Sequence, residues 1–201
     1  MKINVLMVPD PITVTRDASI SEAIDLMKIN SIRHLPVVSK SNKLEGFVTL
    51  GDLKQGLIPS MVGDLSLADL MITDPITVHP NDDIEIAAQL IYKHKIGGMP
   101  VVKKGIVVGI ITAIDLLRSF IDMMGILTAT SRVDVVIGDS RKSFQKVTTI
   151  INDAGGDIIS VAMTAKANNQ RNYYFRLSSC NTTVIRDALE EQGFEVLEAM
   201  D

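Results

Sequence analysis

The chain has 201 residues, a formal net charge of −4 and a mean hydropathy of +0.25. With 46% hydrophobic residues it is too apolar for a disordered protein, and its length allows one domain or two small ones. Its 20 basic and 24 acidic residues give no basic excess, which argues against a nucleic-acid-binding protein.

Cysteine content and apolar runs indicate the cellular setting. Cys180 is the only cysteine, so no intrachain disulfide can form, which fits a reducing compartment. The longest apolar run, at 105–114, is much shorter than the roughly 20 residues of a membrane helix. The apolar start is interrupted by Pro9 and is too brief for a signal peptide. We therefore expect a soluble, cytoplasmic protein with no membrane partner.

The strongest signal in the sequence is an internal repeat with an offset of 64 residues, which falls to 63 after a one-residue loop deletion. The matched segments are LMVPDPITV at 6–14 with LMITDPITV at 70–78, IRHLPVV at 32–38 with IGGMPVV at 96–102, and GFVTLGD at 46–52 with GIITAID at 109–115. The repeat predicts two similar structural units in tandem.

Each unit is predicted to have the order β-α-β-β-α. The first unit opens with a strand in DPITV, and its helix begins at Asp17 or Ser19. The strands LPVV and GFVTL follow, and Asp52 opens a second helix. The apolar positions of the first helix recur at helical spacing, namely Ile20, Ala23, Ile24 and Met27.

The second unit repeats this pattern. Its first helix begins at Asn81 or Asp82, the strands MPVV and GIITA follow, and Asp115 opens the last helix. The apolar helix positions here are Ile84, Ala87, Ala88 and Ile91. A unit of this size cannot bury both faces of its sheet, so we expect two units packed face to face about a pseudo-twofold axis. The clefts between them are candidate ligand sites.

These features together resemble a known family. Each unit is similar to a CBS domain, and the tandem is similar to a CBS pair, or Bateman module. The resemblance rests on DPITV, the Pro-Val-Val strand and the Gly-x-apolar-Thr-x-x-Asp stretch. The resemblance implies CBS repeats at 1–60 and 61–124. It also implies clefts for adenosine-containing ligands such as AMP, ADP, ATP or S-adenosylmethionine.

The repeated Thr-x-x-Asp has two interpretations. In one, Asp52 and Asp115 accept hydrogen bonds from ribose hydroxyls, while Thr49 and Thr112 donate to a phosphate near a helix N-terminus. In the other, Thr-x-x-Asp is a capping box that stabilises the helix start without a ligand. The two interpretations are compatible, because a cap also shapes a cleft.

The resemblance divides the remaining candidate residues between two clefts. Asp115 and Thr112 are expected to face Arg33, His34, Ile76 and Thr77. Asp52 and Thr49 are expected to face Gly97, Gly98, Met99, Ile12 and Thr13. Only the first cleft then holds cations for a phosphate, so we expect it to be the tighter site. The alternative for Arg33 and His34 is a surface ion pair or a solvated strand end.

A third segment follows a linker at 125–131. Residues 132–201 are predicted to have the order β-α-β-β-α-β, the ferredoxin-like arrangement. Asn181 is expected to cap the last helix. This segment resembles an ACT domain, which implies dimerisation and an amino-acid-binding turn at Gly138, Asp139 and Ser140. In the alternative interpretation, Ser140 only caps a helix. A CBS pair with an ACT-like domain resembles the AcuB family, named for acetoin utilisation.

The sequence contains no recognisable catalytic motif. Of the three histidines, His34, His79 and His94, neither His79 nor His94 lies at metal-ligand spacing from a cysteine or carboxylate, and Cys180 has no evident base. We expect a regulatory protein, not an enzyme, without a cofactor or metal. It would form a homodimer, sense a ligand and signal to an unidentified protein partner. The alternative is a dimerising interaction module that binds no nucleotide.

Overall fold

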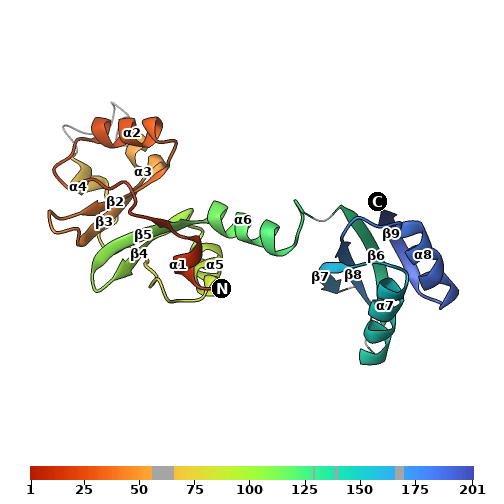
Figure 1. The fold of residues 1–201 in the computed structure, drawn as a ribbon. Coiled ribbons are helices and arrows are strands. Elements are labelled where there is room, and N and C mark those ends of the chain that lie inside the picture. The colour runs from red at the N-terminus through yellow and green to blue at the C-terminus, as the bar shows by residue number, and fades with distance from the viewer. Residues whose placement is uncertain (56–65, 129, 139, 166–169) are drawn as a thin grey trace. The chain divides into compact units, whose positions relative to one another are not determined.

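The computed structural model describes residues 1–55, 66–128, 130–138, 140–165 and 170–201. The chain forms two compact units, Met1–Leu117 and Arg118–Asp201 (Figure 1), and each is described by itself. The division falls inside helix α6, Ala113–Met123, ahead of the linker predicted at 125–131. The predicted boundary between residues 60 and 61 lies outside the described residues.

The first repeat follows its predicted helices and strands closely. Its elements are α1 (Ile3–Leu6), β1 (Val8–Pro9), α2 (Ile20–Ile29), β2 (His34–Val38), β3 (Leu44–Thr49) and α3 (Leu50–Gln55). Ser19, one of the two predicted starts, caps α2 in a capping box with Glu22. The predicted apolar face of α2 is buried, which confirms the helical periodicity.

The second repeat has matching elements. They are α4 (Leu67–Leu70), α5 (Ile84–His94), β4 (Gly98–Lys103), β5 (Ile106–Thr112) and α6. Helix α5 begins after Asp83, so both predicted starts were wrong; Asp82 instead accepts a hydrogen bond from the His79 backbone N–H at 2.8 Å. The strand predicted in each DPITV is a single parallel bridge, Val14 to Val37 and Val78 to Val101. Proline and the preceding turn leave little backbone free for a longer ladder.

The two repeats exchange their leading segments. Strand β1 pairs with β5 of the second repeat, with Val8 opposite Ile110. In the same way, Ile72 exchanges two backbone hydrogen bonds of 3.0 and 2.9 Å with Phe47 in β3. The leading segment of each repeat therefore adds to the last strand of the other repeat.

The hydrophobic cores show the same exchange. Ile3 of α1 is fully buried in the core of the second repeat, and Leu67 of α4 is fully buried in the core of the first. Apart from these helices and the methionines that follow them, Met7 and Met71, each core is built from its own repeat. The exchange joins the two repeats into one unit and explains why Figure 1 shows α1 beside α5 and α4 beside β2 and β3.

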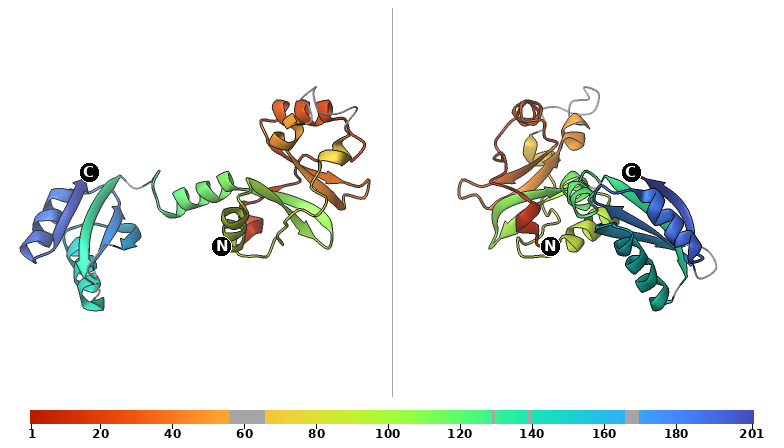
Figure 2. Two further views of the ribbon diagram at one scale, coloured as in Figure 1. Left: turned by 180° about the vertical axis from the view of Figure 1, so that it is seen from behind. Right: turned by 45° about the vertical axis from the view of Figure 1, so that its right-hand side comes forward.

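The second unit is an antiparallel sheet with two helices. Its elements are β6 (Ser131–Gly138), α7 (Arg141–Asp153), β7 (Ile158–Ala165), β8 (Gln170–Leu177), α8 (Thr182–Glu191) and β9 (Glu195–Met200). The sheet order is β7-β8-β6-β9, so the predicted β-α-β-β-α-β arrangement is confirmed. Both helices pack on one sheet face (Figure 2), where Val147 and Ile185 join Val133 and Phe175 in the core.

The predicted caps of this unit have different outcomes. The Asn181 side chain accepts a hydrogen bond from the Thr183 backbone N–H at 3.1 Å, which confirms the cap of α8. Ser140 occupies the cap position of α7, but its side chain makes no capping hydrogen bond. Gly138 ends β6, and Asp139 lies outside the described residues. An amino-acid-binding turn at this position therefore stays a prediction.

Candidate functional site

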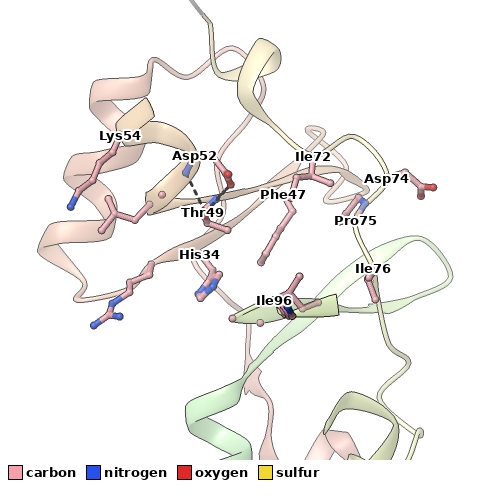
Figure 3. A pocket seen from close by; sticks show the side chains of 16 residues that line it. His34, Phe47, Thr49, Asp52, Lys54, Ile72, Asp74, Pro75, Ile76 and Ile96 are labelled. Atoms are coloured by element: carbon pink, nitrogen blue, oxygen red, sulfur yellow. Dashed lines mark hydrogen bonds between the residues drawn. The ribbon is translucent and has the colours of Figure 1, made fainter. Parts of the chain in front are cut away.

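A cavity of about 970 Å³ lies between the two repeats of the first unit (Figure 3). Its volume is in the range typical of sites for small ligands. Strand β2, the β3–α3 junction, the leading segment of the second repeat and the start of β4 all contribute to it. The lining residues are Arg33, His34, Phe47, Thr49, Leu50, Gly51, Asp52, Lys54, Ile72, Asp74, Pro75, Ile76, Lys95, Ile96, Gly97 and Gly98.

Thr49 and Asp52 form a capping box at the start of α3. The Asp52 Oδ2 accepts hydrogen bonds from the Thr49 backbone N–H at 3.0 Å and from the Thr49 hydroxyl at 2.7 Å. The Asp52 backbone N–H donates back to Thr49 Oγ1 at 3.3 Å. The described residues provide no donor for Asp52 Oδ1, so this oxygen can still accept from a ligand.

Thr112 and Asp115 form the same box at the start of α6. The corresponding distances to Asp115 Oδ2 are 2.8 Å from the Thr112 N–H and 2.6 Å from its hydroxyl. The capping interpretation is therefore confirmed at both repeats. Each threonine has one hydroxyl hydrogen, and here its aspartate accepts it. Donation from Thr49 or Thr112 to a phosphate would require the hydroxyl to turn away from its aspartate, and it stays a prediction.

His34 forms an uncharged wall of the cavity. Its ring stacks on Phe47 with centroids 5.8 Å apart and an interplanar angle of 17°. Burial lowers the pKa of His34 below its ordinary value, Arg33 lowers this pKa further, and Asp52 opposes both. The neutral ring is therefore favoured near pH 7, and His34 does not supply the positive charge expected of it.

Gly97 makes room for this ring across the repeat interface. A Cβ built on Gly97 would lie 2.7 Å from His34 Nε2, closer than any real side chain permits. A Cβ on Gly98 would lie 3.0 Å from the carbonyl oxygen of Ile111 and from Thr112 Cγ2. Both glycines thus have a steric reason. Gly97 lets the two repeats approach closely where the cavity forms, and Gly98 lies close to β5 of its own repeat.

Three cations line the cavity, namely Arg33, Lys54 and Lys95. Within the described residues none of the three takes part in an ion pair. Two carboxylates also line it, and one of them, Asp74, points away from the cavity in Figure 3. The apolar wall opposite Lys54 consists of Ile72, Pro75 and Ile76.

The structure corrects the predicted division of residues between two clefts. Arg33, His34 and Ile76 lie with Asp52, not with Asp115. The reason for Ile76 is the segment exchange, because pairing of Ile72 with β3 carries the following residues to the Asp52 side. His34 lies opposite Thr49 in the β2–β3 register, so both reach the same sheet edge.

The remaining predicted residues have varied positions. Gly97 and Gly98 line the Asp52 cavity as expected. Met99 is fully buried in the core of the second repeat and is not among the residues that line the Asp52 cavity. Thr13 borders a separate shallow groove beside α2. The lining of the Asp52 cavity does not include Ile12, Thr77, Thr112 or Asp115.

Several residues that line the cavity were not predicted from the sequence, among them Phe47, Lys54, Ile72, Lys95 and Ile96. The available signal was the glycine that opens each Gly-x-apolar-Thr-x-x-Asp motif. A glycine inside a strand marks a close backbone approach. Here the exchanged segment passes close to Gly46, and its residue Ile72 pairs with Phe47, the residue after Gly46.

The described part of the chain lacks two further features. It contains no group of three or more His, Cys, Asp or Glu side chains arranged to hold a metal ion. It also has no helix that combines the length and apolar character needed to cross a bilayer.

The sequence of the first unit matches a known family. A model of the CBS domain matches residues 3–58 and 67–122, more than half of the chain. A homoserine O-acetyltransferase of Methanocorpusculum labreanum is 40% identical over 103 residues, 51% of this chain and 20% of that protein. An inosine-5'-monophosphate dehydrogenase of Thermoplasma acidophilum is 33% identical over 172 residues, 82% of this chain and 33% of that protein. The chain thus spans about a fifth to a third of these curated relatives.

Solved structures give similar matches. A putative acetoin utilization protein (AcuB) from Vibrio cholerae is 34% identical with a TM-score of 0.59, covering 63% of this chain and 96% of that one. The CBS domain pair of protein MJ0100, in complex with 5'-methylthioadenosine and S-adenosyl-L-methionine, is 30% identical with a TM-score of 0.56, covering 60% and 95%. CBSX2 of Arabidopsis thaliana in complex with AMP is 27% identical with a TM-score of 0.53, covering 60% and 96%.

Proposed function

The chain belongs to the CBS domain family, and from this premise we propose that it is a regulatory protein that senses an adenosine-containing ligand. The ligand binds in the cavity of Thr49 and Asp52 between the two repeats, and its presence is signalled to a partner. The observation that carries the proposal is this cavity of about 970 Å³, which places the open Asp52 Oδ1 beside an apolar wall.

The cavity offers a separate environment for each part of such a ligand. The apolar wall of Ile72, Pro75 and Ile76, together with the ring of Phe47, suits a planar base. Asp52 Oδ1 suits a ribose hydroxyl, because a carboxylate accepts strong charge-assisted hydrogen bonds. Structures of similar proteins contain AMP, 5'-methylthioadenosine and S-adenosyl-L-methionine, all of which carry adenosine.

Signalling follows from the position of the cavity between the repeats. A ligand that touches Asp52 in the first repeat and Gly97 in the second favours whichever arrangement of the repeats fits it best. The ligand can shift the equilibrium between two arrangements of the repeats only to the extent that it binds one more tightly than the other. We further propose that the second unit is an ACT-like domain that forms a homodimer and passes the shift to a protein partner.

A regulatory role also agrees with the kind of relative found. The matched segment forms a minor part of two enzymes with unrelated chemistry, an acetyltransferase and a dehydrogenase. A segment shared by both supports a role in regulation more than a role in either reaction. We therefore propose that this chain is not itself an enzyme.

A second candidate function is a dimerising interaction module that binds no nucleotide. It is favoured by the two capping boxes, in which Thr49–Asp52 and Thr112–Asp115 are hydrogen-bonded without any ligand. In that case the repeated motif serves only to start α3 and α6.

A thermal-shift panel separates the two functions. Adenosine, AMP, ADP, ATP, NAD and S-adenosylmethionine would be tested on wild type, Asp52→Asn and the matched variant Asp115→Asn. A ligand at 100 times its Kd stabilises the folded state by about 2.7 kcal/mol and raises Tm by several degrees. We expect at least one compound to do so in wild type and Asp115→Asn but not in Asp52→Asn. No shift with any compound would favour the interaction module.

A further inference from the structure

We infer that the Asp52 cavity selects an adenosine ligand bearing a phosphate over the uncharged nucleoside and over the cationic S-adenosylmethionine. Arg33, Lys54 and Lys95 are the residues that determine this selection. The inference rests on the proposed function, since it names the chemical class of ligand for the same site.

The first argument for phosphate selection is the charge of the residues that line the cavity. Arg33, Lys54 and Lys95 border the cavity, and none is neutralised by an ion pair within the described residues. Asp52 is committed to the capping box through Oδ2, and Asp74 points away in Figure 3. Three cations therefore border the cavity against the single carboxylate of Asp52, which leaves an excess of positive charge. A phosphate provides the compensating anion, whereas a sulfonium ligand adds to the repulsion.

The second argument for phosphate selection is the order of apolar, acidic and basic groups along the cavity. Figure 3 shows Lys54 at the end opposite Ile72, Pro75 and Ile76, with Asp52 between the two ends. An adenine nucleotide has the same order of parts, an apolar base, a ribose and a charged phosphate. A base against the apolar wall with its ribose at Asp52 directs the phosphate towards Lys54.

The third argument comes from comparing the two repeats, because the capping box of Thr112 and Asp115 lacks the corresponding cations. By the internal correspondence, Arg33 is replaced by Gly97, Lys54 by Leu117 and Lys95 by Ser31. Lys95 and Ser31 are equivalent in structure too, with φ angles of 54° and 55° after the first helix of their repeats. The Asp115 side therefore has the same Thr-Asp geometry without a counterpart of any of the three cations, and we expect no phosphate selection there.

Calorimetric titrations of adenosine, AMP and S-adenosylmethionine into the full chain test the inference. The key variant is Arg33→Gln/Lys54→Gln/Lys95→Gln. Its matched control is Arg16→Gln/Lys40→Gln/Lys104→Gln, which removes the same charge from exposed positions outside the cavity. Lys104 matches Lys95 because its φ angle of 53° is also positive.

We expect AMP to bind wild type at least about 30-fold more tightly than adenosine, since hydrogen bonds to charged groups contribute about tenfold or more each. The cavity variant should lose most of that factor for AMP and change adenosine affinity less than about threefold, whereas the control should change neither. Added salt should weaken AMP but not adenosine. Equal affinities for AMP and adenosine, tighter binding of S-adenosylmethionine, or an equal loss in the control would overturn the inference. Absence of binding by all three compounds would instead contradict the proposed function.

Discussion

At the scale of single residues, Asp52 combines two roles that the sequence had offered as alternatives. Its Oδ2 closes the capping box with Thr49, and its Oδ1 is left as an acceptor at the cavity. The cap fixes the carboxylate before a ligand arrives, so binding does not need to order this side chain. Asp115 has the same cap but does not line that cavity, which makes it a suitable internal control.

His34 gives the unit a pH dependence of defined sign. Its pKa in the folded state is lowered by burial and by Arg33, against the opposing effect of Asp52. The unfolded state therefore binds more protons near the ordinary pKa of about 6.5, and stability rises with pH there. The contribution of neutral His34 is present above that pH and is lost as the pH falls towards the folded pKa.

We predict that His34→Gln removes this dependence. The free energy of unfolding, measured in urea between about pH 7.5 and 5.5, should fall more steeply for wild type than for His34→Gln. His94→Gln, at an exposed histidine at the end of α5, is the control and should follow wild type. Parallel curves for wild type and His34→Gln would show that His34 does not titrate differently on folding.

At the scale of elements, the exchange of leading segments determines where the cavity lies. Val8 in β1 pairs with β5, and Ile72 pairs with β3, so each repeat completes the sheet of the other. The exchange depends on Gly46 and Gly109. A Cβ on Gly46 would lie 2.7 Å from Met71 Sδ and 3.0 Å from the Ile72 carbonyl oxygen. On Gly109 it would lie 2.6 Å from Met7 Sδ.

We therefore predict that Gly46→Ala destabilises the first unit by about 1–3 kcal/mol, the usual cost of overpacking. Urea unfolding would measure it, with Gly51→Ala as the matched control. A Cβ on Gly51 would contact only Thr49 Oγ1, at 3.5 Å, and alanine suits a helix better than glycine. The control should be neutral or slightly stabilising. Equal stability of Gly46→Ala and wild type would mean that the exchanged segment does not need this close approach.

The helices and most strands could be predicted from local patterns, because helical periodicity, caps and proline positions act within a few residues. The buried face of α2 and the Asn181 cap are examples. The exchange could not be predicted in this way, since β1 and β5 are far apart in sequence and only tertiary contacts select that pairing. The assignment of Ile76 was wrong because it depended on the exchange, and that of His34 was wrong because His34 lies opposite Thr49 in the β2–β3 register.

At the scale of the whole molecule, the chain consists of two units with separate hydrophobic cores. We predict two transitions in differential scanning calorimetry of the full chain. A ligand of the Asp52 cavity should raise only one of them, because binding stabilises the unit that forms the site.

The variant Phe175→Ala shows which calorimetric transition belongs to the second unit. Phe175 is fully buried in the core of the second unit, and loss of a buried phenylalanine ring costs about 3–5 kcal/mol. This variant should lower the transition that the ligand leaves unchanged. A single transition that responds to both the ligand and Phe175→Ala would contradict the independence of the two units.

The central claim is that an adenosine ligand occupies the Asp52 cavity, and a crystal structure grown with saturating AMP tests it most directly. We predict electron density for one nucleotide with a ribose hydroxyl about 2.5–3.0 Å from Asp52 Oδ1, its base against Ile72 and Ile76, and its phosphate towards Lys54. Density beside Asp115 alone, or a cavity that stays empty at saturating AMP, would contradict the account.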